Sequence, residues 1–172
     1  NSQAYNNLGI ALNRLNKKEA ALESYEKAIK IKPDYADAHY NKGNVFDKLK
    51  KYDAAIESYE KAIKIKPDYA EAHYNKGNIF LTQNFNSEAL DNFKKALEFK
   101  PDLDALSGAI LHTKLKLSDW KNFNKDLENF KDEAADLKKL SNPFFFISTY
   151  DSLRLQRNAG KKWSDREISN TP

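Results

Sequence analysis

The chain has 172 residues, a formal net charge of +4 from 29 basic and 25 acidic side chains, and no cysteine. The absence of cysteine excludes disulfides and thiolate metal sites and leaves the compartment open, with the cytoplasm favoured. No stretch stays apolar for the roughly eighteen residues that a transmembrane helix needs, so no membrane contact is expected. No signal peptide is visible, and because Asn1 already lies in register with the repeats that follow, we expect a fragment of a longer protein.

Residues 2–35, 36–69 and 70–103 are three successive stretches of 34 residues each. The segment Glu23–Ala36 recurs letter for letter at Glu57–Ala70. A fixed period of this length indicates a solenoid of stacked units, each with too little apolar surface to be stable alone. Within each unit the pattern predicts two helices and a short polar turn. The helices are expected near 3–15, 19–32, 37–49, 53–66, 71–83 and 87–100.

Six positions of the repeat keep one residue type in all three units. Counted from Ser2, Ala36 and Ala70, these are glycine at eight, a large apolar residue at eleven, alanine at twenty and twenty-seven, an aromatic residue at twenty-four, and proline at thirty-two. The small residues let two helices approach closely, and the large ones fill the space around the crossing. Proline ends the second helix because it lacks a donor and clashes with the preceding turn.

This pattern resembles the tetratricopeptide repeat, which implies an all-α, right-handed superhelix whose first helices line an inner concave surface. The residues that carry the resemblance are Gly9, Leu12, Ala21, Tyr25, Ala28 and Pro33 in the first unit, with equivalents in the other two, such as Gly43, Tyr59 and Pro67, and Gly77, Phe93 and Pro101. Two positions depart from the family: position four is Tyr5, His39 and His73, and position seven is Leu8, Lys42 and Lys76.

The register fades after Pro101. Residues 104–140 are expected to form a degenerate fourth hairpin, with helices over Asp104–Leu117 and from Asp119 to about Leu140. Residues 141–172 are expected to form a helical cap or linker on the open end of the solenoid.

A second resemblance lies in the tail. Asp119-Trp120, Ser141–Phe144, Asp151 and Gln156 follow the order seen where repeats join the catalytic domain in bacterial relatives of O-linked N-acetylglucosamine transferase, the Spindly-like enzymes. The resemblance implies a catalytic domain beyond Pro172. Animal members have histidines where this chain has Phe144 and Phe145, so no catalytic role is transferred.

The candidate binding residues lie on the first helices. Asparagine recurs at position six as Asn7, Asn41 and Asn75. A carboxamide both donates and accepts, so a row of asparagines can hold a peptide backbone whatever its side chains are. Such a ladder is a feature of the transferase repeats; the alternative is that asparagine is simply common at this helix position. The flanking residues are expected either to line a groove or to pack between helices; they are Tyr40, Tyr74, Asn44 and Asn78.

Other chemistry is not indicated. His39 and His73 lie one repeat apart, too far to share a metal at about 2 Å from each ring, so we interpret them as packing residues. Positive and negative charges alternate along the helices, which does not favour nucleic acid. No nucleophile with its base, phosphate loop or cofactor motif is present, so the chain itself is not expected to be an enzyme.

The sequence therefore predicts a protein–protein interaction module that binds an extended peptide in the concave groove. One alternative is the substrate-recognition arm of a glycosyltransferase whose catalytic domain is absent from this chain. A second alternative is a self-assembly module, in which the exposed ends of the solenoid associate weakly between copies.

Overall fold

The computed structural model describes residues 1–103, 106–119, 121–122 and 124–129. The chain divides into two compact units, Asn1–Leu106 and Ser107–Pro172. All regular elements in the described part are α-helices, as the sequence predicts. None of these helices has both the length and the apolar character needed to cross a bilayer.

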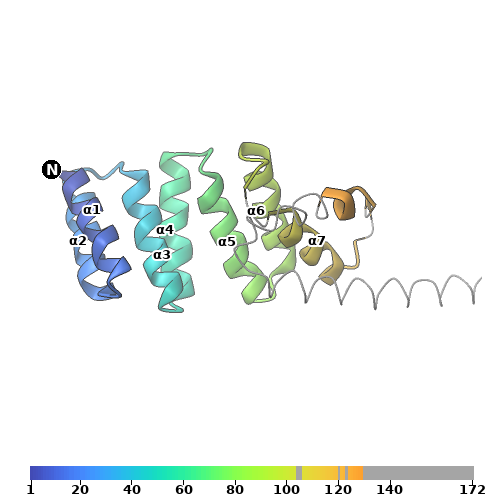
Figure 1. The fold of residues 1–172 in the computed structure, drawn as a ribbon, viewed down its shortest axis with the longest axis horizontal. Helices are drawn as coiled ribbons and strands as arrows, with labels where there is room; N and C mark the ends of the chain where they lie inside the picture. The colour runs from blue at the N-terminus through green and yellow to red at the C-terminus, as the bar shows by residue number, and fades with distance from the viewer. Residues whose placement is uncertain (104–105, 120, 123, 130–172) are drawn as a thin grey trace, which may run out of the picture. The chain divides into compact units, whose positions relative to one another are not determined.

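The first unit consists of three helical hairpins in a row (Figure 1). α1 (Ser2–Arg14) pairs with α2 (Lys18–Ile31), α3 (Ala36–Lys48) with α4 (Tyr52–Ile65), and α5 (Ala70–Thr82) with α6 (Asn86–Phe99). α2 also packs on α3 and α4 on α5, which joins each hairpin to the next. All six predicted helices are present, each beginning and ending one residue earlier than predicted. The expected stack of helical hairpins is therefore confirmed.

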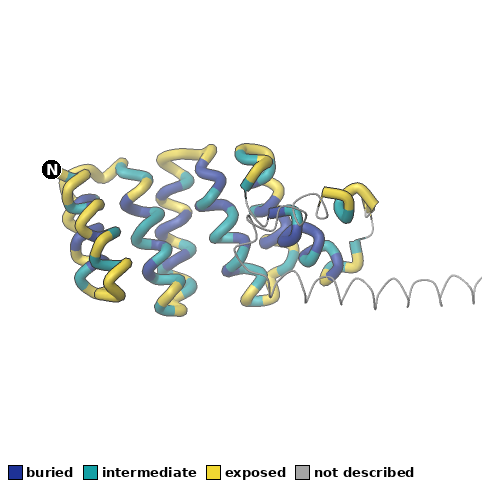
Figure 2. Tube along the Cα trace, viewed as in Figure 1, coloured by how far each residue is buried: buried dark blue, intermediate teal, exposed yellow. Residues whose placement is uncertain are grey.

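Within each hairpin a glycine of the first helix lies directly on an aromatic ring of the second. A Cβ atom added to Gly43 would lie 2.6 Å from Cε1 of Tyr59, and one added to Gly77 would lie 2.7 Å from Cε1 of Phe93. Real Cβ atoms do not approach a ring this closely, so only glycine fits. The rings and the neighbouring alanines are fully buried, and Figure 2 shows this core in dark blue between the paired helices.

The turn inside each hairpin is closed by backbone hydrogen bonds. Asn16, Lys50 and Asn84 adopt left-handed φ angles of 58°, 58° and 64°. The residue after each of them donates its backbone N–H five residues back, as Lys51 does to the carbonyl of Phe46 at 2.9 Å. This is the Schellman arrangement, which satisfies carbonyl groups at a helix end. Asparagine tolerates the left-handed region, but Lys50 adopts it at a steric cost.

The second unit begins within α7 (Leu106–Lys116), which lies inside the predicted Asp104–Leu117 helix. The predicted helix start at Asp119 is wrong, because residues 121–122 form a turn and helical residues resume at 124. Asn122 has a φ of 60°, and Asp119 accepts the backbone N–H of Lys121 at 3.0 Å, which stabilises the turn rather than a helix. An ion pair of 2.5 Å joins Lys114 of α7 to Asp126. The predicted cap, with Phe144 and Phe145, lies outside the described residues.

Candidate peptide-binding face

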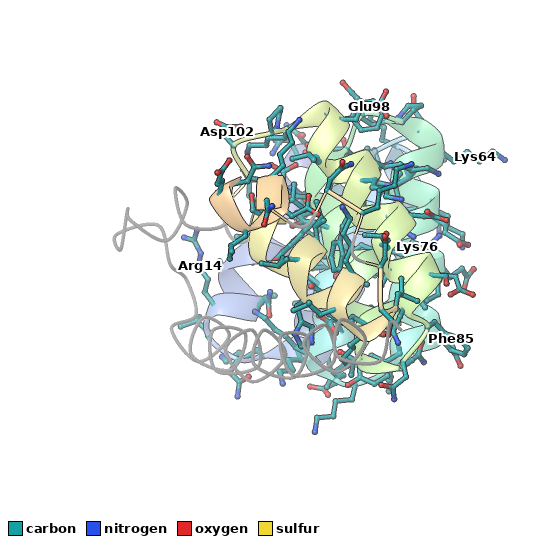
Figure 3. All side chains as sticks on the ribbon, turned by 90° about the vertical axis from the view of Figure 1, so that its right-hand side faces the viewer. Arg14, Lys64, Lys76, Phe85, Glu98 and Asp102 are labelled. Atoms are coloured by element: carbon teal, nitrogen blue, oxygen red, sulfur yellow. The ribbon has the colours of Figure 1, made fainter. Side chains whose placement is uncertain are left out.

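The first helices and the second helices present separate faces of the first unit. Arg14 of α1 and Lys64 of α4 project to opposite sides in Figure 3. The predicted binding residues all lie on the first helices, on α1, α3 and α5. We call the surface made by positions five, six and nine of these helices the first-helix face.

The three asparagines at position six all form hydrogen bonds within the protein. Asn7 is exposed and accepts a bond of 2.8 Å from Gln3 on its own helix. Asn41 donates its Nδ2 to Oδ1 of Asn6 at 3.0 Å, and Asn75 donates its Nδ2 to Oδ1 of Asn44 at 2.9 Å. The second and third asparagines therefore connect neighbouring first helices, and these bonds use the amide nitrogen and not the carbonyl oxygen.

Three predicted residues meet in one network between the second and third repeats. Oδ1 of Asn44 accepts both from Asn75 and from the hydroxyl of Tyr59, at 2.9 and 2.8 Å. The hydroxyl of Tyr40 accepts a second bond from Asn75 at 3.2 Å. The ring of Tyr40 lies 4.8 Å from that of Tyr69 and 5.9 Å from that of Tyr59. Tyr40 and Asn44 thus take part in packing between helices, the alternative that the sequence left open.

The third repeat differs in this network. Tyr74 packs its ring 5.7 Å from Phe93, which has no hydroxyl to donate. Asn78 is half-buried, and its backbone carbonyl accepts a bond from Thr82 at 2.9 Å. The structure therefore does not gather all seven predicted residues into one cluster; it arranges them as a row that crosses three helices.

Sequence reasoning missed a second set of bonds at the edge of the face. Position two accepts from the tyrosine at position thirty-four: Tyr69 donates to Asp37 at 2.9 Å and Tyr35 donates to Gln3 at 2.5 Å. In the third repeat Lys100 bonds to Glu71 at 2.8 Å instead. The sequence signal that could have predicted these bonds is the polar residue at position two of every repeat, which is Gln3, Asp37 or Glu71. Burial and the neighbouring Asp37 carboxylate raise the pKa of Tyr69, so its hydroxyl remains a donor.

The residues that depart from the repeat pattern lie on the first helices α3 and α5, where they contact the preceding repeat. His39 donates from Nε2 to the carbonyl of Pro33 at 3.0 Å, and His73 does the same to Pro67 at 3.1 Å. Both rings are buried, which agrees with the interpretation of His39 and His73 as packing residues. Burial is the main cause that lowers the pKa of both.

The lysines at position seven form ion pairs with the preceding repeat. Lys42 lies 2.9 Å from Glu26 of α2, and Lys76 lies 2.6 Å from Glu60 of α4. A pocket of about 410 Å³ opens beside Lys42, between α2, α3 and α4. Its lining mixes lysine and glutamate, and no group of three possible metal ligands exists in the described residues.

Models of known protein families match the three repeats. Two overlapping matches to the TPR repeat cover residues 9–50 and 43–84, and a match to the tetratricopeptide repeat covers residues 70–103. The chain belongs to the tetratricopeptide-repeat family. This fold is a non-catalytic protein interaction module, which supports the prediction that the chain itself is not an enzyme. No curated protein sequence matches the chain significantly.

Solved structures share the fold at low sequence identity. The crystal structure of MamA is 23% identical with a TM-score of 0.70, and the match covers 78% of this chain and 81% of that one. The first TPR of Spaghetti (RPAP3), bound to an HSP90 peptide, is 18% identical with a TM-score of 0.65 over 68% of this chain and 93% of that one. An O-GlcNAc transferase mutant from Thermobaculum terrenum is 20% identical with a TM-score of 0.61, over 66% of this chain and 22% of that one.

Proposed function

We propose that the first-helix face binds an extended peptide segment of a partner protein. The observation that carries the proposal is the fixed orientation of Asn41 and Asn75. Nδ2 of Asn41 bonds to α1 and Nδ2 of Asn75 bonds to α3, so each carboxamide has a fixed orientation. The carbonyl oxygen of each side chain therefore has a fixed position too. A fixed acceptor loses little side-chain entropy when it accepts a backbone N–H of a ligand. The peptide bound to the Spaghetti repeat domain supports this class of ligand.

The row of asparagines also sets the size of the ligand. Neighbouring packed helices lie about 8–10 Å apart, and an extended chain advances about 3.3 Å per residue. A peptide bonded at α1, α3 and α5 therefore needs about six or seven residues across the row. Because the acceptors are carboxamides and not cations, we expect the backbone rather than a terminal carboxylate to be recognised.

The experiment must separate binding from stability, because Asn41 and Asn75 also connect helices. Arrayed seven-residue peptides are screened with the chain, and the strongest binder is then titrated by fluorescence anisotropy. Asn7→Ala removes an exposed asparagine that bonds only within α1, so we expect weaker binding with an unchanged melting curve. The triple change of Asn7, Asn41 and Asn75 to Ala is expected to lose binding altogether.

A matched control uses a polar residue elsewhere. Asn92 of α6 bonds to the backbone of Glu88 on the same helix, so Asn92→Ala removes a similar contact from the other face. We expect Asn92→Ala to bind the peptide as the parent does. Equal binding by the triple variant and the parent would count against the proposal.

The glycosyltransferase arm is the second proposal. Its support is the fold shared with the Thermobaculum terrenum O-GlcNAc transferase, of which the match covers only 22%. The tail motifs that suggested it lie almost wholly outside the described residues. Sequencing the gene beyond Pro172 tests it directly: a nucleotide-sugar-binding domain there supports the idea, and any other continuation ends it.

A further inference from the structure

The asparagines at position six of the second and third repeats each keep one oxygen atom free. Asn41 and Asn75 bond to their neighbours through Nδ2, and neither Oδ1 accepts a hydrogen bond within the described residues. Both side chains are half-buried, and neither oxygen is among the fully buried atoms that lack a partner, so both are accessible to solvent. The first-helix face therefore presents two free acceptors that are one repeat apart.

The distance between these two acceptors is set by the spacing of neighbouring first helices. α1, α3 and α5 follow one another along the first unit (Figure 1), and α3 contacts both α1 and α5. Packed helices lie about 8–10 Å apart. Because Asn41 and Asn75 occupy the same position in successive repeats and both bond to the preceding first helix through Nδ2, their oxygens are separated by about the same distance.

This spacing selects the backbone conformation of the ligand. In a β-strand the N–H groups on one side recur every two residues, at about 6.6 Å, which is too short, and the next multiple of about 13 Å is too long. An α-helix is excluded because its N–H groups bond within the helix. In a polyproline II helix equivalent groups recur every three residues, at about 9.3 Å, which matches the helix spacing. The N–H groups of residues i and i+3 can then bond to the two asparagines in turn.

Tyrosine rings line the same face at the same interval. A half-buried tyrosine stands one residue before each of these asparagines, as Tyr40 and Tyr74. Tyr40 packs its ring 4.8 Å from that of Tyr69, and Tyr74 packs its ring 5.7 Å from that of Phe93. Both rings are therefore held in place before a ligand binds. Grooves lined with aromatic rings are a recurring surface for proline-rich segments in the polyproline II conformation.

We propose that the ligand of the first-helix face is a proline-rich segment in the polyproline II conformation. Every third residue donates its backbone N–H to an asparagine at position six, so proline is excluded at that residue because it has no N–H. Prolines between these residues pack against Tyr40 and Tyr74. Proline also favours this conformation in the free peptide, so little backbone entropy is lost on binding. The inference rests on the proposed function and specifies the conformation and composition of the peptide.

Peptides that differ in the spacing of their N–H groups test the proposal without any change to the protein. An acetylated, fluorescently labelled peptide of three Ala-Pro-Pro units has an N–H at every third residue. A peptide of the same length in which alanine and proline alternate never has two N–H groups three residues apart. In anisotropy titrations we expect the first peptide to bind at least about fivefold more tightly, the difference made by one hydrogen bond. A peptide of prolines alone, which has no N–H in its repeat, should bind more weakly than either.

A variant of Asn75 connects the preference between the two peptides to the site. Asn75→Ala removes one of the two acceptors, so the ratio of the two affinities should fall from about fivefold toward one. A change that only loosened the fold would weaken the binding of both peptides and leave this ratio as it was. The matched control is Asn92→Ala on α6, where the side chain bonds to the backbone of its own helix. This control should keep the ratio of the parent.

The outcomes distinguish a failure of this proposal from a failure of the proposed function. If arrayed seven-residue peptides bind through the asparagines but the Ala-Pro-Pro peptide binds no more tightly than the alternating one, peptide binding stands and the polyproline II conformation is overturned. If no peptide of the array or of this set binds, both proposals fail. A preference that persists unchanged in Asn75→Ala also overturns the inference, because another part of the chain then selects the peptide.

Discussion

The hydroxyl of Tyr59 donates a hydrogen bond of 2.8 Å to Asn44, whereas the hydroxyl of the equivalent Tyr25 is buried and has no partner within the described residues. The cause is one residue: position nine of the first repeat is Ile10, which has no acceptor. Burial also raises the pKa of Tyr25 to about 12. A buried polar group without a partner costs about 1–3 kcal/mol.

We therefore predict opposite effects from the same substitution in two repeats. Tyr25→Phe removes the unpaired hydroxyl and should raise the free energy of unfolding by about 1 kcal/mol. Tyr59→Phe removes a satisfied hydrogen bond and should lower it by about 1 kcal/mol. Urea unfolding followed by circular dichroism measures both. Phe93 at the same position of the third repeat shows that phenylalanine fits.

The control for this pair is Ile10→Asn, which gives Tyr25 the acceptor that Tyr59 has. In that background Tyr25→Phe should become destabilising. Similar losses from Tyr25→Phe and Tyr59→Phe in the parent chain would show that the missing acceptor does not matter.

The fold was predictable because close packing leaves a periodic trace. Gly43 and Tyr59 recur with one period, since a ring that touches a backbone excludes every other residue from the glycine position. The hydrogen-bond partners were not predictable in the same way. Asn41 bonds to an amide at position five, Asn6, whereas Asn75 bonds to a hydroxyl at that position, Tyr40, and also to Asn44 at position nine. The acceptor therefore changes from one repeat to the next and has no constant pattern in the sequence.

A change of Gly43 to Ala tests how tightly the hairpin is packed. The added Cβ would lie 2.6 Å from Cε1 of Tyr59, a buried ring held on all sides. We predict a loss of about 1–3 kcal/mol in the free energy of unfolding, the usual cost of overpacking. Lys48→Ala on the exposed side of the same helix is the control and should change it by less than about 0.5 kcal/mol.

A double-mutant cycle identifies the ring as the cause. Tyr59→Leu shortens the side chain opposite Gly43, so Gly43→Ala should cost less in that background than in the parent. The two changes are in contact and are expected to be non-additive by about 0.5–3 kcal/mol. Strict additivity would mean that the glycine is needed for another reason.

Lys50 gives a prediction about the turns. Its φ of 58° lies in the left-handed region, where its equivalents are Asn16 and Asn84. Asparagine is more tolerant of this region than lysine, since its short side chain can bond locally. Lys50→Asn should therefore raise the melting temperature slightly, and Lys50→Val should lower it clearly, as measured by calorimetry. Lys51→Asn, one residue on and outside the left-handed region, is the control that should do neither.

The last prediction concerns pH. Burial lowers the pKa of His39 and His73 in the folded chain relative to the ordinary value of about 6.5 in the unfolded chain. The unfolded chain therefore binds more protons once the pH falls below that value, and the free energy of unfolding falls with it. Stability should be full above about pH 7 and should decline between about pH 6.5 and 5, before most carboxylates titrate.

The control replaces both histidines with tyrosine, the residue that the first repeat has at this position as Tyr5. This change should flatten the decline of the free energy of unfolding between about pH 6.5 and 5, as measured by urea unfolding. The smaller slope that remains should come from His112, because burial also lowers the pKa of that ring. An unchanged slope in the double variant would show that the two buried rings are not its source.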